Sequence, residues 1–132
     1  MKKRKIVCLF LIFVVSTVLF AQSAELLSAN KKTAIRCLDL AEKYILSNDW
    51  ENALVQAELG ISYDNSISDL DFIKATAQNH LDYSKTQVLE TLNFAFLKNN
   101  WINYNYNRAR ILNADLLSDT GSYDESIQIL SS

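Results

Sequence analysis

The sequence predicts an all-α fold of stacked antiparallel helical hairpins that follows an N-terminal signal helix. Two observations predict this fold. The 132 residues include no proline and only two glycines, which are the residues that most disfavour helix interiors. Apolar residues also recur at intervals of three and four along successive segments, a spacing that places them on one face of a helix. The length allows one domain.

The first 21 residues have the layout of a secretory signal peptide. Four basic residues at positions 2–5 precede an apolar run over 6–15, and Ala21 offers a small residue for cleavage. The bond after Ser23 is a second candidate. An uncleaved membrane anchor is the alternative, but residues 6–20 at about 1.5 Å each cover only ~22 Å of a hydrocarbon core roughly 30 Å thick. We therefore expect residues 1–21 to be a signal peptide and residues 22–132 to be the exported domain.

Export places the domain in the periplasm or elsewhere in the bacterial cell envelope. The chain has 13 Lys and Arg residues against 15 Asp and Glu, so without the four basic residues at positions 2–5 nine remain and the net charge is near −6. This charge disfavours nucleic acid and anionic membrane surfaces as partners. Membrane contact is expected only through an uncleaved signal segment. Cys37 is then the only cysteine left, so packing alone must hold the fold.

The first hairpin is predicted over residues 34–61. Its apolar or small positions, at helical spacing and interrupted by the turn 47–49, are Ala34, Cys37, Leu38, Ala41, Tyr44, Ile45, Ala53, Leu54, Ala57 and Ile61. Asp49 is the expected N-cap of the second helix. Glu51 lies in its first turn, where the helix dipole favours an acid.

A third helix is predicted to start near Ser66, and a further helical segment covers residues 84–98. Ser66, Ser68, Asp69 and Asp71 mark the start of the third helix. We interpret the two aspartates as capping residues and not as an acid/base pair. The segment 84–98 has two apolar faces, a pattern typical of a helix sandwiched between neighbours. Its faces comprise Val88, Leu89, Leu92 and Phe96 on one side and Phe94 and Leu97 on the other.

Residues 99–107, NNWINYNYN, alternate asparagine with apolar, mainly aromatic residues. A single strand without a partner strand cannot satisfy its backbone, so we expect a loop that leads into a helix at about Tyr106. Its aromatic side chains either pack against the preceding helix or form an exposed contact surface. Both alternatives stay open at this point.

The last predicted helix is short. Gly121 suits a tight turn, and residues 122–125 have the S-x-x-E form of a capping box. Only nine residues follow Tyr123, so we expect a final apolar edge at Ile127 and Leu130 that requires a partner.

Self-comparison reveals a repeat. "NDWENALVQ" (48–56) is similar to "GSYDESIQI" (121–129), and "LDYSKTQVL" (81–89) is a weaker third copy. Their aromatic residues are Trp50, Tyr83 and Tyr123, which lie 33 and 40 residues apart. Periods of this size indicate repeated helical hairpins.

Here the sequence resembles the tetratricopeptide repeat (TPR) family, whose unit of about 34 residues is two antiparallel helices. The matching positions are Leu40, Ala41 and Tyr44 with Cys37 in the tryptophan place, then Ala53, Ala57 and Gly60; Ala75, Leu81 and Tyr83 in the second copy; and Ala114, Leu117, Gly121, Tyr123, Ser126 and Leu130 in the third. Asn65 replaces the usual proline. The resemblance covers roughly residues 34–132 and implies a TPR-like α-solenoid of about two and a half repeats.

Small residues on the helix stripe are explained by this resemblance. Ala41, Ala53, Ala57 and Gly60 would let the helices of one hairpin, and the first helix of the next, approach closely. Packing then offsets the helix penalty of glycine, which is about 1 kcal/mol.

The sequence offers no basis for a catalytic assignment. His80 is the only histidine, Cys37 occupies a repeat position that is normally buried, and no metal spacing, phosphate loop or nucleophile motif occurs. We therefore expect a non-enzyme without cofactors.

The resemblance instead implies a concave groove for a protein or peptide partner. The groove positions would be Leu38, Glu42, Ile45, Phe72, Thr76, Asn79, Ile111, Asp115 and Ser118. The lysines and asparagines with which some family members grip a terminal carboxylate are absent from the matching places, so an apolar or basic segment suits this groove better. Ordinary packing is the alternative interpretation of each position.

These observations predict a protein–protein interaction module of the cell envelope that uses its groove or its open C-terminal edge. The alternatives are a self-associating structural subunit, and hence a homo-oligomer, or a shortened fragment of a longer repeat array. A small-molecule-binding accessory protein is a third hypothesis that no residue favours.

Overall fold

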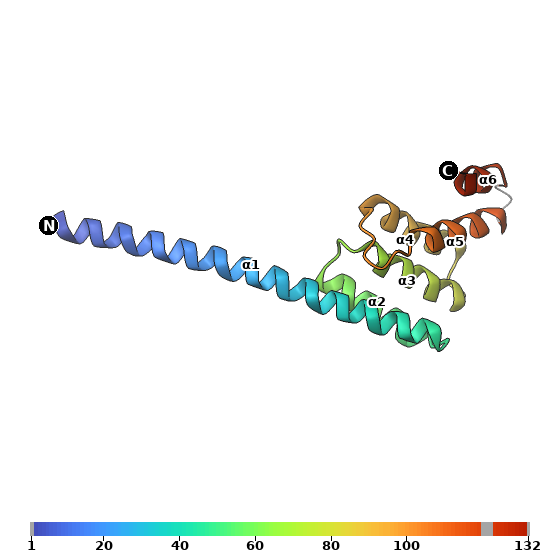
Figure 1. Cartoon of the computed structure of the whole chain (residues 1–132), viewed down its shortest axis with the longest axis horizontal. Coiled ribbons are helices and arrows are strands. Elements are labelled where there is room, and N and C mark those ends of the chain that lie inside the picture. The colour runs from blue at the N-terminus through green and yellow to red at the C-terminus, as the bar shows by residue number, and fades with distance from the viewer. Residues whose placement is uncertain (1, 120–122, 132) are drawn as a thin grey trace. The chain divides into compact units, whose positions relative to one another are not determined.

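The structure is a computed structural model that describes the backbone of residues 2–119 and 123–131, with side chains described for residues 23–119, 125 and 127–131. Within these residues it contains six α-helices and no strand (Figure 1). The helices are α1 (Lys2–Leu46), α2 (Trp50–Tyr63), α3 (Ser68–His80), α4 (Lys85–Lys98), α5 (Tyr106–Asp119) and α6 (Tyr123–Ser131).

The chain divides into two units, residues 1–32 and residues 33–132. The first unit is helical throughout its described part and belongs to α1. The predicted signal peptide, residues 1–21, lies in this unit. Its side chains are outside the described residues, so the signal peptide stays a prediction. Among the residues that the structure describes, no helix combines the length and apolar character that a membrane crossing requires.

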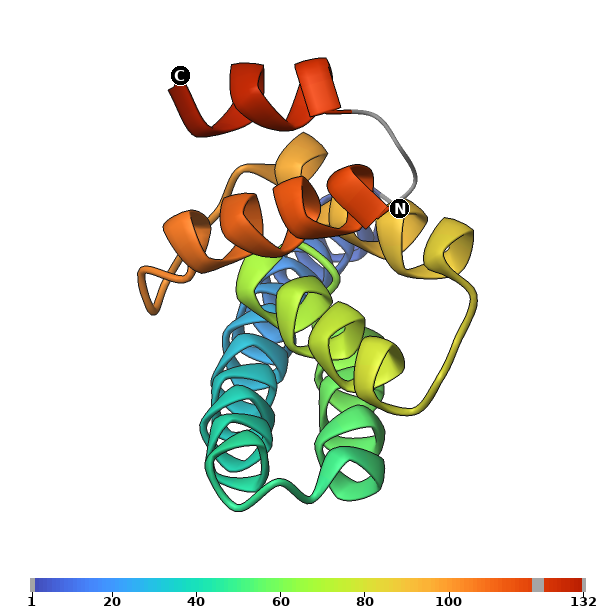
Figure 2. The same ribbon diagram turned by 90° about the vertical axis from the view of Figure 1, so that its right-hand side faces the viewer.

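The second unit consists of three successive helical hairpins. The end of α1 lies beside α2 and is joined to it by the turn 47–49, as Figure 2 shows. Helix α3 pairs with α4, and α5 with α6. Helix α3 is central, because it also contacts α2 and α5. The predicted stack of antiparallel hairpins is thus confirmed.

The small residues of α1 and α2 form a close contact in the core. Ala41, Ala53 and Ala57 are fully buried. A Cβ atom added to Gly60 would lie 2.8 Å from Cδ2 of Leu70 and 3.1 Å from Cβ of Cys37. Helices α1, α2 and α3 therefore meet at Gly60 with no space for a methyl group, as the small-residue stripe predicts.

Helix α2 begins with a side-chain cap and helix α3 does not. The Asp49 carboxylate accepts a hydrogen bond from the backbone N–H of Asn52 at 3.3 Å, so the predicted N-cap is confirmed. At α3 the N-cap residue is Ile67, and no side chain caps the helix. The prediction that Asp69 and Asp71 are capping residues is wrong, because both carboxylates are buried and bind groups of the α4–α5 region.

Helix α4 is not sandwiched. Val88 and Leu92 are buried on its inner face, whereas Phe94 and Leu97 are exposed to solvent. Among the described residues α4 packs against α3 and α5, and neither helix covers its second apolar face fully. The prediction of a helix covered on both sides is therefore wrong.

The Asn-rich segment is a loop that leads into α5 at Tyr106, as expected. Both alternatives for its aromatic side chains occur. The ring of Trp101 packs near Phe96 and Tyr106, with centroids 6.0 and 5.6 Å apart. Tyr104 is 91% exposed.

The C-terminal helix α6 packs against α5, and the Arg110 guanidinium donates a hydrogen bond to the carbonyl oxygen of Ile129. Ile127 and Leu130 are exposed, so the predicted apolar edge is present. The predicted turn at Gly121 and the capping box that begins at Ser122 lie outside the described residues.

Candidate binding groove

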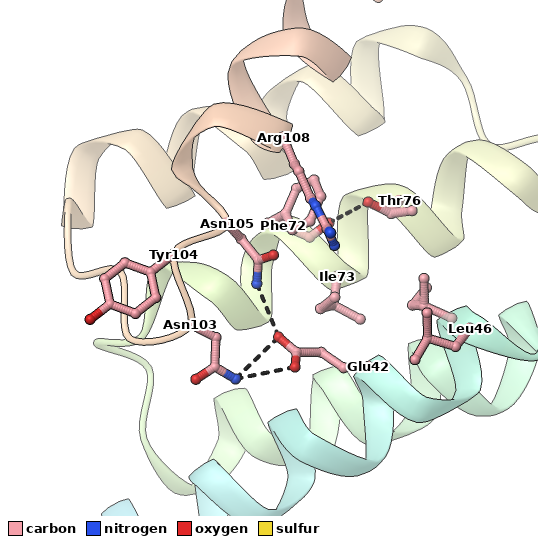
Figure 3. Close-up of a pocket in the computed structure, with 10 residues that line it drawn as sticks. Glu42, Leu46, Phe72, Ile73, Thr76, Asn103, Tyr104, Asn105 and Arg108 are labelled. Atoms are coloured by element: carbon pink, nitrogen blue, oxygen red, sulfur yellow. Dashed lines mark hydrogen bonds between the residues drawn. The ribbon is translucent and has the colours of Figure 1, made fainter.

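A groove of about 590 Å³ lies between the end of α1, helix α3 and the segment that enters α5 (Figure 3). Its lining residues are Glu42, Ile45, Leu46, Phe72, Ile73, Thr76, Asn103, Tyr104, Asn105 and Arg108. A smaller hollow of about 230 Å³ shares Phe72, Thr76 and Arg108 with the groove. It continues along α5 to Ile111 and Asp115.

Six of the nine predicted groove positions line these two hollows. They are Glu42, Ile45, Phe72, Thr76, Ile111 and Asp115. Asn79 and Ser118 line neither hollow. Leu38 is fully buried, so its prediction as a lining residue is wrong: it packs in the hydrophobic core. Whether the other positions bind a partner stays a prediction.

A network of carboxylates and amides builds one wall of the groove. Glu42 on α1 accepts hydrogen bonds from Nδ2 of Asn103 at 3.2 Å and from Nδ2 of Asn105 at 3.0 Å. Asp69 on α3, fully buried, accepts from the backbone N–H groups of Ile102 and Asn103 at 2.6 and 3.0 Å. Asp69 also accepts from Nδ2 of Asn105 at 3.0 Å. A buried carboxylate requires such donors, since an unpaired one is costly.

The first turn of α3 holds the loop at two further points. The backbone N–H of Ser68 donates to the carbonyl oxygen of Asn100, whose own N–H donates to Oγ of Ser68, at 2.9 and 2.8 Å. Asp71 forms an ion pair with Lys98, the last residue of α4, at 2.6 Å. Burial raises the pKa of Asp71, and the Lys98 ammonium opposes this shift. The loop is therefore tied to α3 along much of its length.

Arg108 changes the expected charge of the groove. The preference for a basic segment depended on Glu42 and Asp115. Glu42, however, already accepts hydrogen bonds from two amides, and Arg108 adds a guanidinium group to both hollows. Within the part of the chain that the structure describes, no carboxylate forms an ion pair with Arg108. Arg108 thus adds one positive charge to a lining that also holds Glu42 and Asp115, and the expected apolar or basic segment stays a prediction.

The loop side of the groove, and part of its helical side, was not predicted from the sequence. The missed lining residues are Leu46, Ile73, Asn103, Tyr104, Asn105, Arg108 and Leu112. The alternation of asparagine with apolar residues was the available signal, but it identified only a loop and not the helices that the loop contacts.

The two residues considered for nucleophilic chemistry have other environments. Cys37 is buried, and burial raises its pKa, so the reactive thiolate form is disfavoured. The His80 ring stacks on the Trp50 ring with centroids 3.6 Å apart. Among the described residues, no group of three or more His, Cys, Asp or Glu side chains could hold a metal ion.

Comparison with known sequences finds no matching family model. One similar protein is an uncharacterized protein of Treponema pallidum (strain Nichols), with 29% identity over 92 residues. The match covers 69% of this chain but only 12% of the longer protein.

Comparison with solved structures gives TPR domains. The second TPR of Spaghetti (RPAP3), bound to the HSP90 peptide SRMEEVD, matches with a TM-score of 0.65 and 19% identity, over 78% of this chain and 91% of that one. The crystal structure of MamA matches with a TM-score of 0.60 and 18% identity, over 80% of this chain and 59% of that one. These structures and the three helical hairpins show that the chain has a TPR-like helical-repeat fold.

Proposed function

We propose that this chain is a protein-interaction module that binds a segment of a partner protein in the groove between α1, α3 and α5. The observation that carries the proposal is the groove itself, with apolar walls and a few oriented polar groups. Peptide and ligand sites combine an apolar surface with a small number of placed polar groups in this way. The fold supports the proposal, because the similar Spaghetti domain is bound to a peptide.

The groove also leaves apolar surface open. Leu46 and Ile111 line its two hollows, yet their exposed fractions are 83% and 53%. The partly buried Ile45 and Leu112 line the same hollows. Exposed apolar surface that gathers at one site on a soluble protein is typical of an interaction site.

The cellular setting belongs to the same proposal. Residues 1–21 support export by a cleaved signal peptide, so the partner would be another protein of the cell envelope. The mass of the chain recovered from fractionated cells tests this. Export predicts an envelope fraction with a mass that fits cleavage after Ala21 or Ser23, and an uncleaved chain in the cytoplasm would contradict it.

A pair of matched substitutions tests the groove. Ile111→Asp places a charge in the smaller hollow that continues the groove along α5, whereas Val55→Asp places one on α2, away from both hollows, at a residue of similar exposure (57%). The full-length chain and both variants serve as baits for envelope extract. We expect Val55→Asp to recover the same partner as the unmodified chain and Ile111→Asp to lose it. Equal recovery by both variants would remove the groove from the proposal.

The exposed edge of α6 supports a second candidate function, self-association. Ile127 and Leu130 would be covered by a second copy, or by another repeat in a longer array. Light scattering over a concentration series separates this from the groove proposal. Self-association predicts that the mass of the unmodified chain rises with concentration. The mass of the Leu130→Glu variant should stay at the monomer value. A monomer at all concentrations would exclude it.

A further inference from the structure

Tyr104 has an unusual backbone conformation for an exposed aromatic residue. Its φ of 61° lies in the left-handed region, which side chains other than glycine adopt only at an energetic cost. Its neighbours Asn103 and Asn105 are both held by Glu42 and Asp69. The segment is thus anchored on both sides of a residue that is itself 91% exposed. Strained positions held by their surroundings cluster at ligand-binding sites.

These hydrogen bonds also fix the orientation of the two asparagine side-chain amides. Both Nδ2 atoms donate to carboxylates, and Figure 3 shows them turned toward Glu42. The Oδ1 atoms can only accept, and none of the described residues donates a hydrogen bond to either of them. In the described part of the chain, Nε1 of Trp101 is the one fully buried side-chain atom that lacks a hydrogen-bond partner. Neither Oδ1 atom is therefore fully buried. Asn103 is partly exposed whereas Asn105 is only 5% exposed, so the oxygen of Asn103 is the more accessible acceptor.

Two apolar side chains border the same groove as these acceptors. Leu46 and Tyr104 are the most exposed large apolar residues of the described chain. In Figure 3 they lie at opposite ends of the pocket, one on α1 and one on the loop. Phe72 and Ile73 lie between them in Figure 3, and Ile45 also lines the groove. An occupant with a large apolar side chain would cover this surface.

We infer that the loop segment 103–105 determines which partners enter the groove, and that the occupant is an extended peptide segment. Its backbone N–H groups donate to Oδ1 of Asn103 or Asn105, and its large apolar side chain packs against Tyr104. Glu42 and Asp69 are positioning residues that act through the asparagines. This inference rests on the proposed function and specifies its partner.

An extended segment fits the acceptors better than a helix or a folded surface does. In an α-helix the backbone N–H groups already donate hydrogen bonds to the helix's own carbonyl oxygens. An extended chain leaves them free, and side chains alternate between its two faces about every 3.3 Å. One face can therefore present an apolar side chain to Tyr104 while the backbone supplies donors to the asparagine oxygens.

The test begins with short random peptides displayed on phage and selected on the full-length chain. The most enriched peptide is synthesised with a fluorescent label, and its Kd is measured by anisotropy. We expect Tyr104→Ala to weaken binding about tenfold or more, as truncation of a central aromatic contact does. Tyr104→Phe should retain most of the affinity. Tyr83→Ala removes an exposed tyrosine on the α3–α4 turn, outside the groove, and should leave the Kd unchanged.

Methylation of single backbone nitrogens in the same peptide tests whether its N–H groups donate to the asparagine oxygens. At least one position should lose about tenfold or more in affinity, because the methyl group removes the donor that the asparagine oxygens require. Uniform tolerance of methylation would overturn the role of the asparagines.

The remaining outcomes separate the two proposals. A peptide that loses affinity for Ile111→Asp but binds Tyr104→Ala unchanged overturns this inference and leaves the proposed function standing. Equal losses in Tyr104→Ala and Tyr83→Ala would indicate nonspecific apolar binding and overturn it as well. A selection that enriches no peptide counts against both proposals.

Discussion

The contact of α1, α2 and α3 at Gly60 differs in kind from the contact of the α4–α5 loop with α3. The first contact is apolar and consists of small residues at helical spacing, with Gly60 against Leu70 and Cys37. The second is polar, and Asp69 there accepts hydrogen bonds from residues 33 to 36 positions away. Apolar periodicity is a local property, so it can be predicted from a few neighbouring residues. Pairing of buried polar groups depends on the fold as a whole.

The largest expected effect comes from removing the polar contact. Asp69→Ala leaves two backbone N–H groups and one amide without their acceptor, so we expect a loss of about 3 kcal/mol in the free energy of unfolding, at roughly 1 kcal/mol or more for each buried donor. Urea unfolding measures this loss. Hydrogen exchange at the N–H groups of Ile102 and Asn103 should also accelerate.

The matched control for that variant is Asp39→Ala, which removes an exposed carboxylate from α1. It should change the free energy of unfolding by less than about 0.5 kcal/mol. Equal effects of the two variants would mean that the loop contact is dispensable for stability.

A smaller loss is expected from overpacking the apolar contact. Ala53 is fully buried, so Ala53→Leu should cost about 1–3 kcal/mol. Each 1 kcal/mol lowers the Tm by roughly 4–8 °C in a domain of this size. Calorimetry or circular dichroism measures the change, and Val55→Leu at an exposed position of the same helix is the control. An unchanged Tm in Ala53→Leu would contradict close packing here.

The N-cap of α2 tests the same comparison. Asp49, like Asp69, is an aspartate that accepts a backbone hydrogen bond, but its donor lies only three residues away. Asp49→Ala removes the hydrogen bond to the N–H of Asn52 and should cost about 1 kcal/mol, less than Asp69→Ala. Asp49→Asn, which preserves a capping oxygen, should cost only a few tenths. Urea unfolding of all three variants tests the order. If Asp49→Ala costs more than Asp69→Ala, the contrast between local and distant acceptors fails.

The smallest expected effect concerns pH. Burial raises the pKa of Asp71 above its ordinary value of 3.8, so the folded chain holds that proton more tightly than the unfolded chain does. This contribution to stability is present below pH 3.8 and is lost as the pH rises through the raised pKa. Asp71→Asn does not titrate. The difference in unfolding free energy between the two proteins should therefore shift in favour of Asp71→Asn as the pH rises, and a pH-independent difference would contradict the shift.

The sequence predicted the hairpins, the Asp49 cap and the start of α5 correctly, since each depends on residues within one or two helical turns. Asp69 was misassigned because an aspartate in a first helical turn has the same local pattern whether it caps its own helix or binds a distant loop. Phe94 and Leu97 were expected to be covered because the pattern of one helix does not reveal how many neighbours it has.

The groove was predicted on part of its helical side and missed on its loop side for the same reason. Glu42, Phe72 and Thr76 follow from their places in a repeated unit. Asn103, Tyr104 and Asn105 fall outside the unit, and only their hydrogen bonds to α1 and α3 bring them to the groove. Leu38 shows the opposite error, because a place in the repeat does not ensure exposure.

The ring stack of Trp50 and His80 has a practical consequence. It joins the first residue of α2 to the last residue of α3, with the ring planes only 2° from parallel. Indole fluorescence responds to the group that covers the ring, so Trp50 is a built-in optical probe of the spacing between the first two hairpins. A rotation of one hairpin against the other would change its emission without any added label.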